Sequence, residues 1–314
     1  MEIPLDLART LAVVIDEGTF DAAARRLRVT PSAVSQRIKA LEQQLGRVLV
    51  VRSKPVRATD AGAAVVRLAR QLALLEHDTL AEFGLDAAPV RPVSLPLAVN
   101  ADSLATWFLP ALARVAERHP VVFDLHRDDQ DFTAGLLESG TVMGAVTSQA
   151  TPVAGCHVRP LGVMRYEAVA TPGFAARWAL PRGVASDGAE AADVASSSAF
   201  AAAPVVEFDR RDDLQRHYLA GRGVDPAGPS RHYVPASSDF AAAVKLGLGW
   251  GLLPGFQSFA ELAAGDLVRL GGAPVDVPLY WQQWNLRSPL LDAVADALAE
   301  EASTALRPPD RRAP

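Results

Sequence analysis

The chain has 314 residues, of which 49% are hydrophobic and 21% are charged, and its net charge at pH 7 is −5. This length exceeds what one hydrophobic core usually spans, so at least two domains are expected. The composition excludes an intrinsically disordered chain, and the single cysteine, Cys156, excludes an internal disulfide framework.

The charge is distributed unevenly along the chain. Residues 25–57 contain nine Lys or Arg side chains and one acid, Glu42, although the whole chain is negative. Dense local positive charge indicates a polyanion bound at one end of the molecule, and a solvated basic helix face is the alternative. Charged residues or prolines interrupt every long apolar stretch, so no signal peptide, membrane span or membrane contact is expected, and a cytoplasmic location follows.

Three short helices are predicted at the amino-terminal end. Apolar residues recur at helical spacing over residues 7–15 and again over 20–27. The third helix begins at Thr30 and Pro31, because a threonine hydroxyl caps helix amides and proline is favoured at the first helical position. Gly46 ends this helix.

The third helix has one apolar and one polar face. Its apolar residues recur every three or four positions from Val34 to Leu45, so Ser, Gln and Lys side chains lie opposite. Such a face suits a recognition helix in the major groove, although a generic helical hairpin is the alternative. Residues 48–51 then predict a strand, and residues 52–57 predict a basic wing that places cations along the DNA backbone or into the minor groove. The predicted DNA-binding residues are Thr30, Pro31, Ser32, Ser35, Gln36, Arg37, Lys39, Arg52, Lys54 and Arg57.

These motifs carry a resemblance to a known family. The run from Phe20 to Glu42, and the later Leu45-Gly46, Leu49, Arg52 and Thr59-Asp60-Ala61-Gly62, resemble the amino-terminal signature of LysR-type transcriptional regulators. The resemblance implies a winged helix-turn-helix, a long dimerisation helix and a two-lobed α/β effector domain similar to type 2 periplasmic binding proteins.

The resemblance extends along nearly the whole chain to one subgroup, the regulators of lysine and arginine export (the ArgP/LysG group). The segments 99–107, 203–209 and 279–281 are similar to segments of that subgroup. Met143 stands where the wider family often has aspartate, which again resembles the export regulators.

A long helix is predicted from Thr59 to about Phe83. Its apolar residues alternate three and four apart, which is the pattern of a coiled-coil seam, and packing against its own domain is the alternative. A dimer would place two recognition helices on half-sites about 34 Å or a multiple apart. The predicted seam residues are Val65, Leu68, Leu72 and Leu75.

The predicted domain organisation has five segments. Residues 1–58 form the winged helix-turn-helix, 59–85 the dimerisation helix, and 86–96, with three prolines, a hinge linker. Residues 97–306 alternate strands and helices, which predicts an α/β effector domain with a mostly parallel sheet. A disordered tail, 307–314, follows.

The effector domain is expected to have two lobes. The resemblance divides them into lobe I, about 97–166 and 267–306, and lobe II, about 167–266. The predicted strands are 97–99, 121–125, 142–146, 167–170, 205–208, 250–253, 267–270 and 279–284, and the predicted helices are 103–119, 132–137, 214–220, 240–246 and 289–306.

An enzymatic function is not supported. The chain contains no G-x-S-x-G elbow, no phosphate-binding P-loop and no H-E-x-x-H motif, and its six histidines do not fall at metal-ligand spacing. A Cys156 and His157 nucleophile pair is the alternative, but adjacent residues seldom face one another. No catalytic residue, metal or cofactor is therefore predicted.

Polar residues where strands end and helices begin predict a small-molecule effector site in a cleft between the lobes. Free amides and hydroxyls at such points bind carboxylates, although ordinary helix caps are the alternative. The resemblance suggests lysine or arginine, whose cation would need an acid, and four tryptophans (107, 250, 281, 284) line the cleft or, more commonly for buried aromatic residues, belong to the core. The predicted effector-binding residues are Asn100, Asp102, Ser103, Thr106, Asp128, Thr147, Ser148, Asp209, Ser238 and Asp239.

The sequence therefore predicts a DNA-binding LysR-type regulator that senses lysine or arginine and controls an amino-acid exporter gene. Its expected partners are double-stranded promoter DNA, further copies of itself as a dimer or tetramer, and RNA polymerase. Effector binding is expected to close the lobes, to rotate the dimer partners through the seam helices, and to change the half-site spacing or the DNA bending. The alternatives are a LysR-type regulator of another metabolite pathway and an architectural or replication-origin DNA-binding protein.

Overall fold

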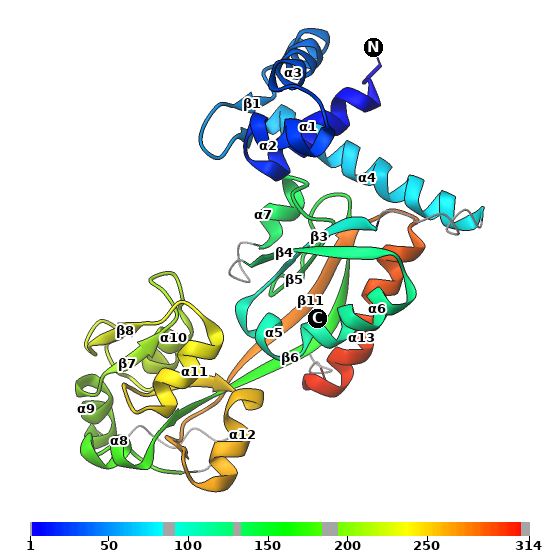
Figure 1. The fold of residues 1–314 in the computed structure, drawn as a ribbon. Helices are drawn as coiled ribbons and strands as arrows, with labels where there is room; N and C mark the ends of the chain where they lie inside the picture. Colours follow the sequence, from blue (N-terminus) through cyan, green and yellow to red (C-terminus); the bar gives the residue numbers. More distant parts are fainter. Residues whose placement is uncertain (1, 84–91, 128–132, 184–193, 309–314) are drawn as a thin grey trace. The chain divides into compact units, whose positions relative to one another are not determined.

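The computed structural model describes most of the chain (Figure 1). It divides into two compact units, which are described separately below. None of the described helices is both long and apolar enough to cross a membrane. The described residues are 2–83, 92–127, 133–183 and 194–308.

The first unit, Met1–Asn100, Ala111–Arg159 and Tyr280–Leu298, begins with the reader, the name used here for residues 2–58. Fully buried apolar side chains from its helices and hairpin form one core together with α4. The strand β1 is shorter than predicted, because Val48 is 67% exposed and does not pair with β2. The elements are α1 (Leu5–Glu17), α2 (Phe20–Leu27), α3 (Pro31–Leu45), the antiparallel strands β1 (Val50–Val51) and β2 (Arg57–Ala58), and α4 (Asp60–Glu82).

Local signals determine where α3 begins and ends. The Thr30 hydroxyl accepts a hydrogen bond from the Ala33 amide at 3.2 Å, and Pro31 occupies the first helical position. Gly46 ends the helix with φ 64°, a left-handed conformation that favours glycine. The predicted start and end of this helix are confirmed.

The remainder of the first unit contains a sheet. Strand β3 pairs in parallel with β4 and β5, and β5 pairs antiparallel with β11. Helices α6 and α13 lie side by side (Figure 1), and Arg114 donates a hydrogen bond to the Ala297 carbonyl. The elements are β3 (Val93–Val99), α6 (Phe108–Arg118), β4 (Val121–Arg127), α7 (Thr133–Glu138), β5 (Gly144–Thr147), β11 (Val275–Trp284) and α13 (Pro289–Ala305).

Two predictions in this region are wrong. The predicted linker is too long, because β3 begins at Val93; residues 86–91 lie outside the described residues. Pro96 is compatible with the strand because its carbonyl still accepts the Met143 amide. The predicted helix 103–119 is two helices, since Pro110 has no amide proton and its ring clashes with the carbonyl four residues earlier.

The second unit comprises Ala101–Pro110, Pro160–Leu279 and Ala299–Pro314, so the units divide near 160 and 280 rather than near the predicted 166 and 267. Strand β6 pairs antiparallel with β9 and β10, whereas β7 and β8 are parallel, so the mostly parallel sheet that was predicted is mixed. The elements are α5 (Ala101–Thr106), β6 (Cys156–Ala170), α8 (Pro172–Arg177), α9 (Val194–Ala202), β7 (Val205–Glu207), α10 (Leu214–Gly221), β8 (Arg231–Tyr233), α11 (Ser237–Lys245), β9 (Gly251–Pro254), α12 (Gly255–Ala264) and β10 (Val268–Arg269).

Two of these elements contribute to the core of the second unit through large aromatic residues. Trp250 is fully buried and lies 5.1 Å from the Phe200 ring and 5.5 Å from the Tyr218 ring, measured between centroids. Trp107, Trp281 and Trp284 are also at least 90% buried. The tryptophans therefore belong to the core, which was the alternative to lining a cleft.

The strand β8 and the helices α8, α9 and α12 were not predicted.

Gly144 has no space for a side chain. A Cβ atom added there would lie 2.3 Å from Cζ2 of the buried Trp281. Gly144→Ala is expected to lower the free energy of unfolding by about 1–3 kcal/mol, the usual cost of overpacking, measured as a lower urea midpoint.

The matched control is Gly135→Ala in α7, where nothing lies within 4 Å of an added Cβ. Alanine is the better helix former there, so we expect an unchanged midpoint or a stabilisation of about 0.4–1 kcal/mol. Equal midpoints for both variants would contradict the packing argument.

Candidate functional site

The polar face of α3 is exposed. Val34, Ile38 and Leu41 are fully buried on the opposite face, which fixes the rotation of the helix about its axis. Gln36 is therefore exposed rather than inside the core. Of the predicted residues on or before α3, Thr30, Pro31, Ser32, Gln36 and Lys39 are exposed and Ser35 and Arg37 are half-buried.

Arg37 differs from the other predicted DNA-binding residues. Its Nη1 donates a long hydrogen bond, 3.5 Å, to the hydroxyl of Thr10 in α1. Thr10 is 1% exposed and donates in turn to the Asp6 carbonyl at 2.9 Å. This contact joins α3 to α1, so Arg37 has a role in packing the reader.

The wing is fixed to the reader by backbone and ring contacts. The Val56 amide donates to the Gly18 carbonyl at 2.8 Å, and the Arg52 guanidinium lies 5.5 Å from the centroid of the Phe20 ring. Arg52, Lys54 and Arg57 are all exposed, as a surface that binds phosphates requires.

Glu42, the only acid in the basic window, has a structural role that the sequence interpretation missed. Its Oε1 accepts a hydrogen bond from the Leu49 amide at 2.8 Å, and its carbonyl accepts the Arg47 amide at 3.2 Å. Glu42 therefore fixes the position of the wing relative to α3. A carboxylate reaching a backbone amide seven residues away leaves no simple sequence signal.

Asp102 is the centre of a polar cluster in the second unit. Its Oδ2 accepts a hydrogen bond from the Tyr166 hydroxyl at 2.7 Å, and its Oδ1 accepts one from the Ser237 hydroxyl at 2.6 Å. Gln257 Nε2 donates to the Ser237 oxygen at 2.8 Å. We call these four residues the Asp102 cluster. Tyr166, Ser237 and Gln257 were not among the predicted effector-binding residues.

Burial makes the charge of Asp102 costly. Desolvation raises the pKa of Asp102 above its ordinary value, and the hydrogen bonds from Ser237 and Tyr166 oppose this effect without cancelling it. A cation placed against this carboxylate would favour its ionised form. The cluster is thus chemically suited to an ammonium or guanidinium group.

Ser103 and Thr106 flank Asp102 on α5. The Ser103 side chain is fully buried, and its hydroxyl has no hydrogen-bond partner among the described residues, so it is a donor that a ligand could use. The Thr106 hydroxyl donates to the Asp102 carbonyl at 2.6 Å, a local bond within the helix.

The start of α11 contributes a different residue from those predicted. Ser238 and Asp239 are exposed, whereas Ser237 is 6% exposed and bonds Asp102. Ser237, rather than the predicted Ser238 and Asp239, therefore belongs to the Asp102 cluster. The buried face of α11 is set by distant packing, which the sequence pattern does not show.

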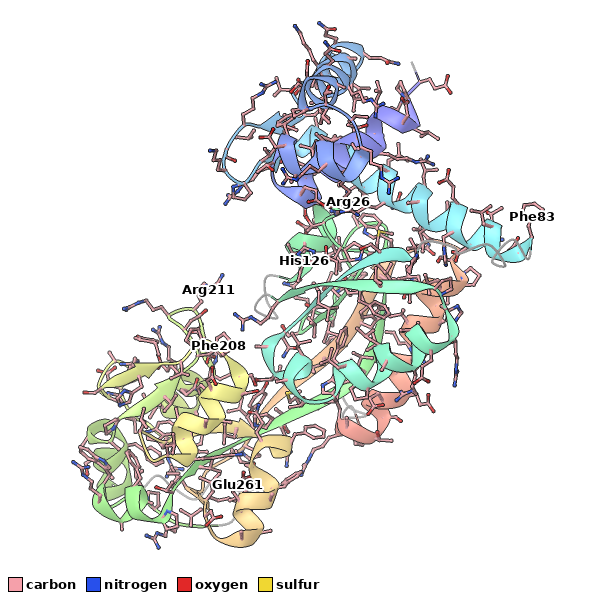
Figure 2. The ribbon with its side chains drawn as sticks, in the orientation of Figure 1. Arg26, Phe83, His126, Phe208, Arg211 and Glu261 are labelled. Carbon is pink, nitrogen blue, oxygen red and sulfur yellow. The ribbon has the colours of Figure 1, made fainter. Side chains whose placement is uncertain are left out.

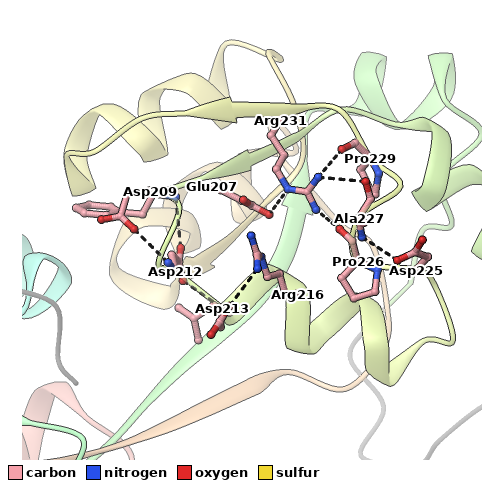
Figure 3. A network of polar contacts seen from close by, with 12 residues as sticks. Glu207, Asp209, Asp212, Asp213, Arg216, Asp225, Pro226, Ala227, Pro229 and Arg231 are labelled. Atoms are coloured by element: carbon pink, nitrogen blue, oxygen red, sulfur yellow. Dashed lines mark hydrogen bonds and ion pairs between the residues drawn. The ribbon is translucent and has the colours of Figure 1, made fainter. Parts of the chain in front are cut away.

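Asp209 caps its own turn after β7. Its Oδ1 accepts the amides of Arg211 at 2.6 Å and Asp212 at 3.1 Å (Figure 3). Figure 2 labels Phe208 and Arg211 in this turn, and the Phe208 amide donates to Asp212 at 3.3 Å. The contacts of Asp209 are therefore those of a turn-forming residue.

The remaining predicted effector residues lie in the first unit. Leu97 and Ala98 of β3 pair with Gly144 and Ala145 of β5, so Asn100 and Thr147 follow at the carboxyl ends of neighbouring parallel strands. In the part of the chain that the structure describes, the Oδ1 of the buried Asn100 has no hydrogen-bond partner, and the buried Thr147 hydroxyl oxygen accepts the Gln149 amide at 3.1 Å. Ser148 is half-buried, and Asp128 lies outside the described residues.

The seam residues differ in exposure. Val65 is 5% exposed and lies in the core of the reader, so it offers no surface to a second chain. Leu68 and Leu72 are half-buried. Leu75, at 36%, begins an exposed apolar run toward the end of the helix, where Phe83 is 71% exposed (Figure 2).

The chemistry of Cys156 does not favour catalysis. Burial raises the pKa of its thiol to about 11, so the nucleophilic thiolate is scarce at neutral pH. Within the described ranges, no three His, Cys, Asp or Glu residues are grouped so that they could hold a metal ion.

Asp102→Asn is expected to raise the melting temperature at pH 7. The pKa of Asp102 is higher in the folded protein than in the unfolded chain, so protonation of this carboxyl stabilises the fold. This stabilisation is fully present below the ordinary pKa, and it is lost as the pH rises through the raised pKa. Asparagine keeps the shape without ionising. The gain over the wild type should therefore shrink as the pH falls toward 4, as measured by calorimetry.

Asp296→Asn is the matched control for this prediction. Asp296 is 75% exposed in an ion pair with Arg159, so a small effect of about 0–1 kcal/mol is expected. A gain for Asp102→Asn that stays constant from pH 4 to pH 8 would show that desolvation is not its cause.

Comparisons with known proteins give consistent matches. Residues 5–63 match the family described as "Bacterial regulatory helix-turn-helix protein, lysR family", and residues 93–303 match the "LysR substrate binding domain". The lysine export transcriptional regulatory protein LysG of Corynebacterium efficiens is 46% identical over 300 residues, covering 95% of this chain and 97% of that protein.

Two solved structures are similar along nearly their whole length. The crystal structure of ArgP from Mycobacterium tuberculosis has a TM-score of 0.78 and 44% identity, covering 96% of this chain and 98% of that one. The full-length LysG from Corynebacterium glutamicum with bound effector arginine has a TM-score of 0.71 and 40% identity, covering 97% and 100%.

Proposed function

Because the chain belongs to the LysR family of bacterial transcriptional regulators, we propose that it binds promoter DNA and senses arginine or lysine to control an amino-acid exporter gene. The observation that carries the effector class is the Asp102 carboxylate, which is desolvated and bonded by the hydroxyls of Tyr166 and Ser237. The similar LysG of Corynebacterium efficiens, a lysine export regulator, and the LysG structure with bound arginine support the same effector class.

The reader supplies the DNA contacts in this proposal. The amide of Gln36 and the ammonium of Lys39 lie on the exposed face of α3, where they would reach base edges in the major groove. The exposed cations of the wing, Lys54 and Arg57, would lie along phosphates. Ser32 near the start of α3 would add a phosphate contact.

The Asp102 cluster supplies the effector contact. We assign the cationic group of the amino acid to the Asp102 carboxylate and a further hydrogen bond to the unpartnered Ser103 hydroxyl. Asn100, Thr147 and Ser148 remain predicted effector contacts of the first unit.

A homodimer completes the proposal. Half-buried Leu68 and Leu72, with exposed Leu75 and Phe83, support a seam along α4. Two readers would then contact two half-sites. Tetramer formation, contact with RNA polymerase and a cytoplasmic location are proposed on the resemblance alone.

The two kinds of DNA contact can be separated by mutation. Gln36→Ala is expected to reduce the preference for one base at one position by about 1–3 kcal/mol. Lys54→Ala should instead weaken binding to all DNA sequences alike, and it should lower the slope of log affinity against log salt concentration by about one. Competition binding to duplexes selected from a random pool measures both. Lys54 is the better wing probe, because Arg52 also contacts the Phe20 ring.

An unchanged base preference in Gln36→Ala would contradict the proposal that α3 lies in the major groove. An unchanged salt slope in Lys54→Ala would contradict the proposed phosphate contact. Glu2→Gln, at an exposed residue outside the basic window, is the control and should change neither quantity.

Calorimetry with arginine, lysine and citrulline tests the effector class. Arginine and lysine are expected to bind, and citrulline, an uncharged analogue of arginine, is expected to bind at least tenfold more weakly. Asp102→Asn should weaken arginine binding by about ten- to a hundredfold, since a charge-assisted hydrogen bond contributes about 1.5–3 kcal/mol to affinity.

The control is Asp239→Asn, an exposed acid on α11 that should leave arginine binding unchanged. Equal binding of citrulline and arginine would overturn the proposal that the effector is a basic amino acid. Full arginine affinity in folded Asp102→Asn would instead overturn the assignment of Asp102.

A further inference from the structure

Arg70 of α4 contacts two other parts of the first unit. Its Nη1 donates to the carbonyls of Gly140 and Thr141, both at 2.6 Å, and its Nη2 pairs with the Asp16 carboxylate near the end of α1. Only 11% of the Arg70 side chain is exposed, and 26% of that of Asp16. This three-way contact joins the reader, α4 and the segment between α7 and β5.

A second arginine supports the same contact one helical turn earlier. Arg67 Nη1 donates to the Glu138 carbonyl at 2.8 Å, and its guanidinium lies 4.9 Å from the centroid of the Trp284 ring. Gly140, with φ 68°, allows the close approach, because an added Cβ would lie 2.4 Å from the Arg67 Cβ. Residues 138–141 are thus held against α4 by two guanidinium groups.

The contact has a route to the reading surface on one side. Asp16 lies on α1, and α1 bonds α3 through Thr10 and Arg37. On the other side, residues 140–141 lead directly into β5, whose last residue is Thr147, a predicted effector contact. The Met143 amide also donates to the Pro96 carbonyl of β3 at 2.8 Å, which ties the segment to the sheet.

A cavity lies beside this ion pair. Asp16, Arg70, Leu74, Leu95 and Met143 are among its lining residues, so the guanidinium borders free volume on one side. A polar contact next to free volume is suited to having two arrangements, which coupling between sites requires.

We propose that Arg70 is a positioning residue that couples effector binding to DNA binding, by holding α1 on the carbonyls of residues 140–141. The inference rests on the proposed function for its two ligands. It goes beyond that function because it assigns the coupling to one side chain that contacts neither DNA nor effector.

The test uses the full chain, arginine, and a duplex selected by the wild type from a random pool. The measured quantity is the ratio of DNA affinities with and without saturating arginine, which in allosteric proteins is typically about 5–150-fold. In Arg70→Met this ratio is expected to fall to about one, while arginine affinity measured by calorimetry stays within about twofold of the wild type. A wild-type ratio retained in Arg70→Met would overturn the proposal.

Arg9→Gln is the matched control. Arg9 also pairs α1 with α4, through Glu76, but both side chains are about half exposed. This variant should keep the wild-type ratio. An equal loss in both variants would show that any ion pair between α1 and α4 suffices, and would also overturn the special role of Arg70.

Hydrogen exchange keeps the inference testable if arginine does not change DNA binding by the wild type, a result that would count against the proposed function instead. Asp16→Ala removes the acceptor that anchors Arg70 on α1, and it leaves the sequence of residues 138–142 unaltered. Exchange of the Ser139, Gly140 and Val142 amides, which donate to carbonyls of residues 135–137 in α7, is expected to rise about threefold or more. Unchanged exchange, with Arg9→Gln as control, would show that α1 and this segment are not coupled.

Discussion

The exposed polar face of α3, which contains Gln36 and Lys39, depends on the burial of the opposite face of the helix. Val34, Ile38 and Leu41 are fully buried, and each such side chain contributes about 1.5–3 kcal/mol on removal from water. Successive helical residues are 100° apart, so this stripe determines the direction of every other side chain on the helix. Gln36 and Lys39, the proposed DNA contacts of α3, are therefore exposed by an apolar interaction that involves neither of them.

Local signals were sufficient to predict the three helices of the reader. Thr30 acts through a side-chain cap on a neighbouring amide, and Pro31 and Gly46 act through their backbone geometry, which is why the bounds of α3 follow from the sequence. Pro110 is a local signal of the same kind that the interpretation overlooked, and it divides α5 from α6. The short strand β8 has no signal of its own, because it exists through its pairing with β7.

The Asp102 cluster could be predicted only in part, because it is assembled from distant segments. Asp102 is a helix-start acid and was selected for that reason, but its partners Tyr166 and Ser237 are 64 and 135 residues away in sequence. The choice between Ser237 and Ser238 depends on which face of α11 is buried, and only the packing of the second unit decides that.

Two acids of the second unit show what a buried carboxylate needs. Glu207 is fully buried, and its Oε1 receives the Arg231 guanidinium at 2.8 Å; the same guanidinium also bonds the Pro226 and Pro229 carbonyls (Figure 3). Its counter-charge is thus part of the fold. The carboxylate of Asp102 is bonded by hydroxyls instead, and its pKa is raised. Hydroxyls orient a carboxylate without neutralising it, so in the proposed function the cation that would complete the Asp102 cluster is that of the effector.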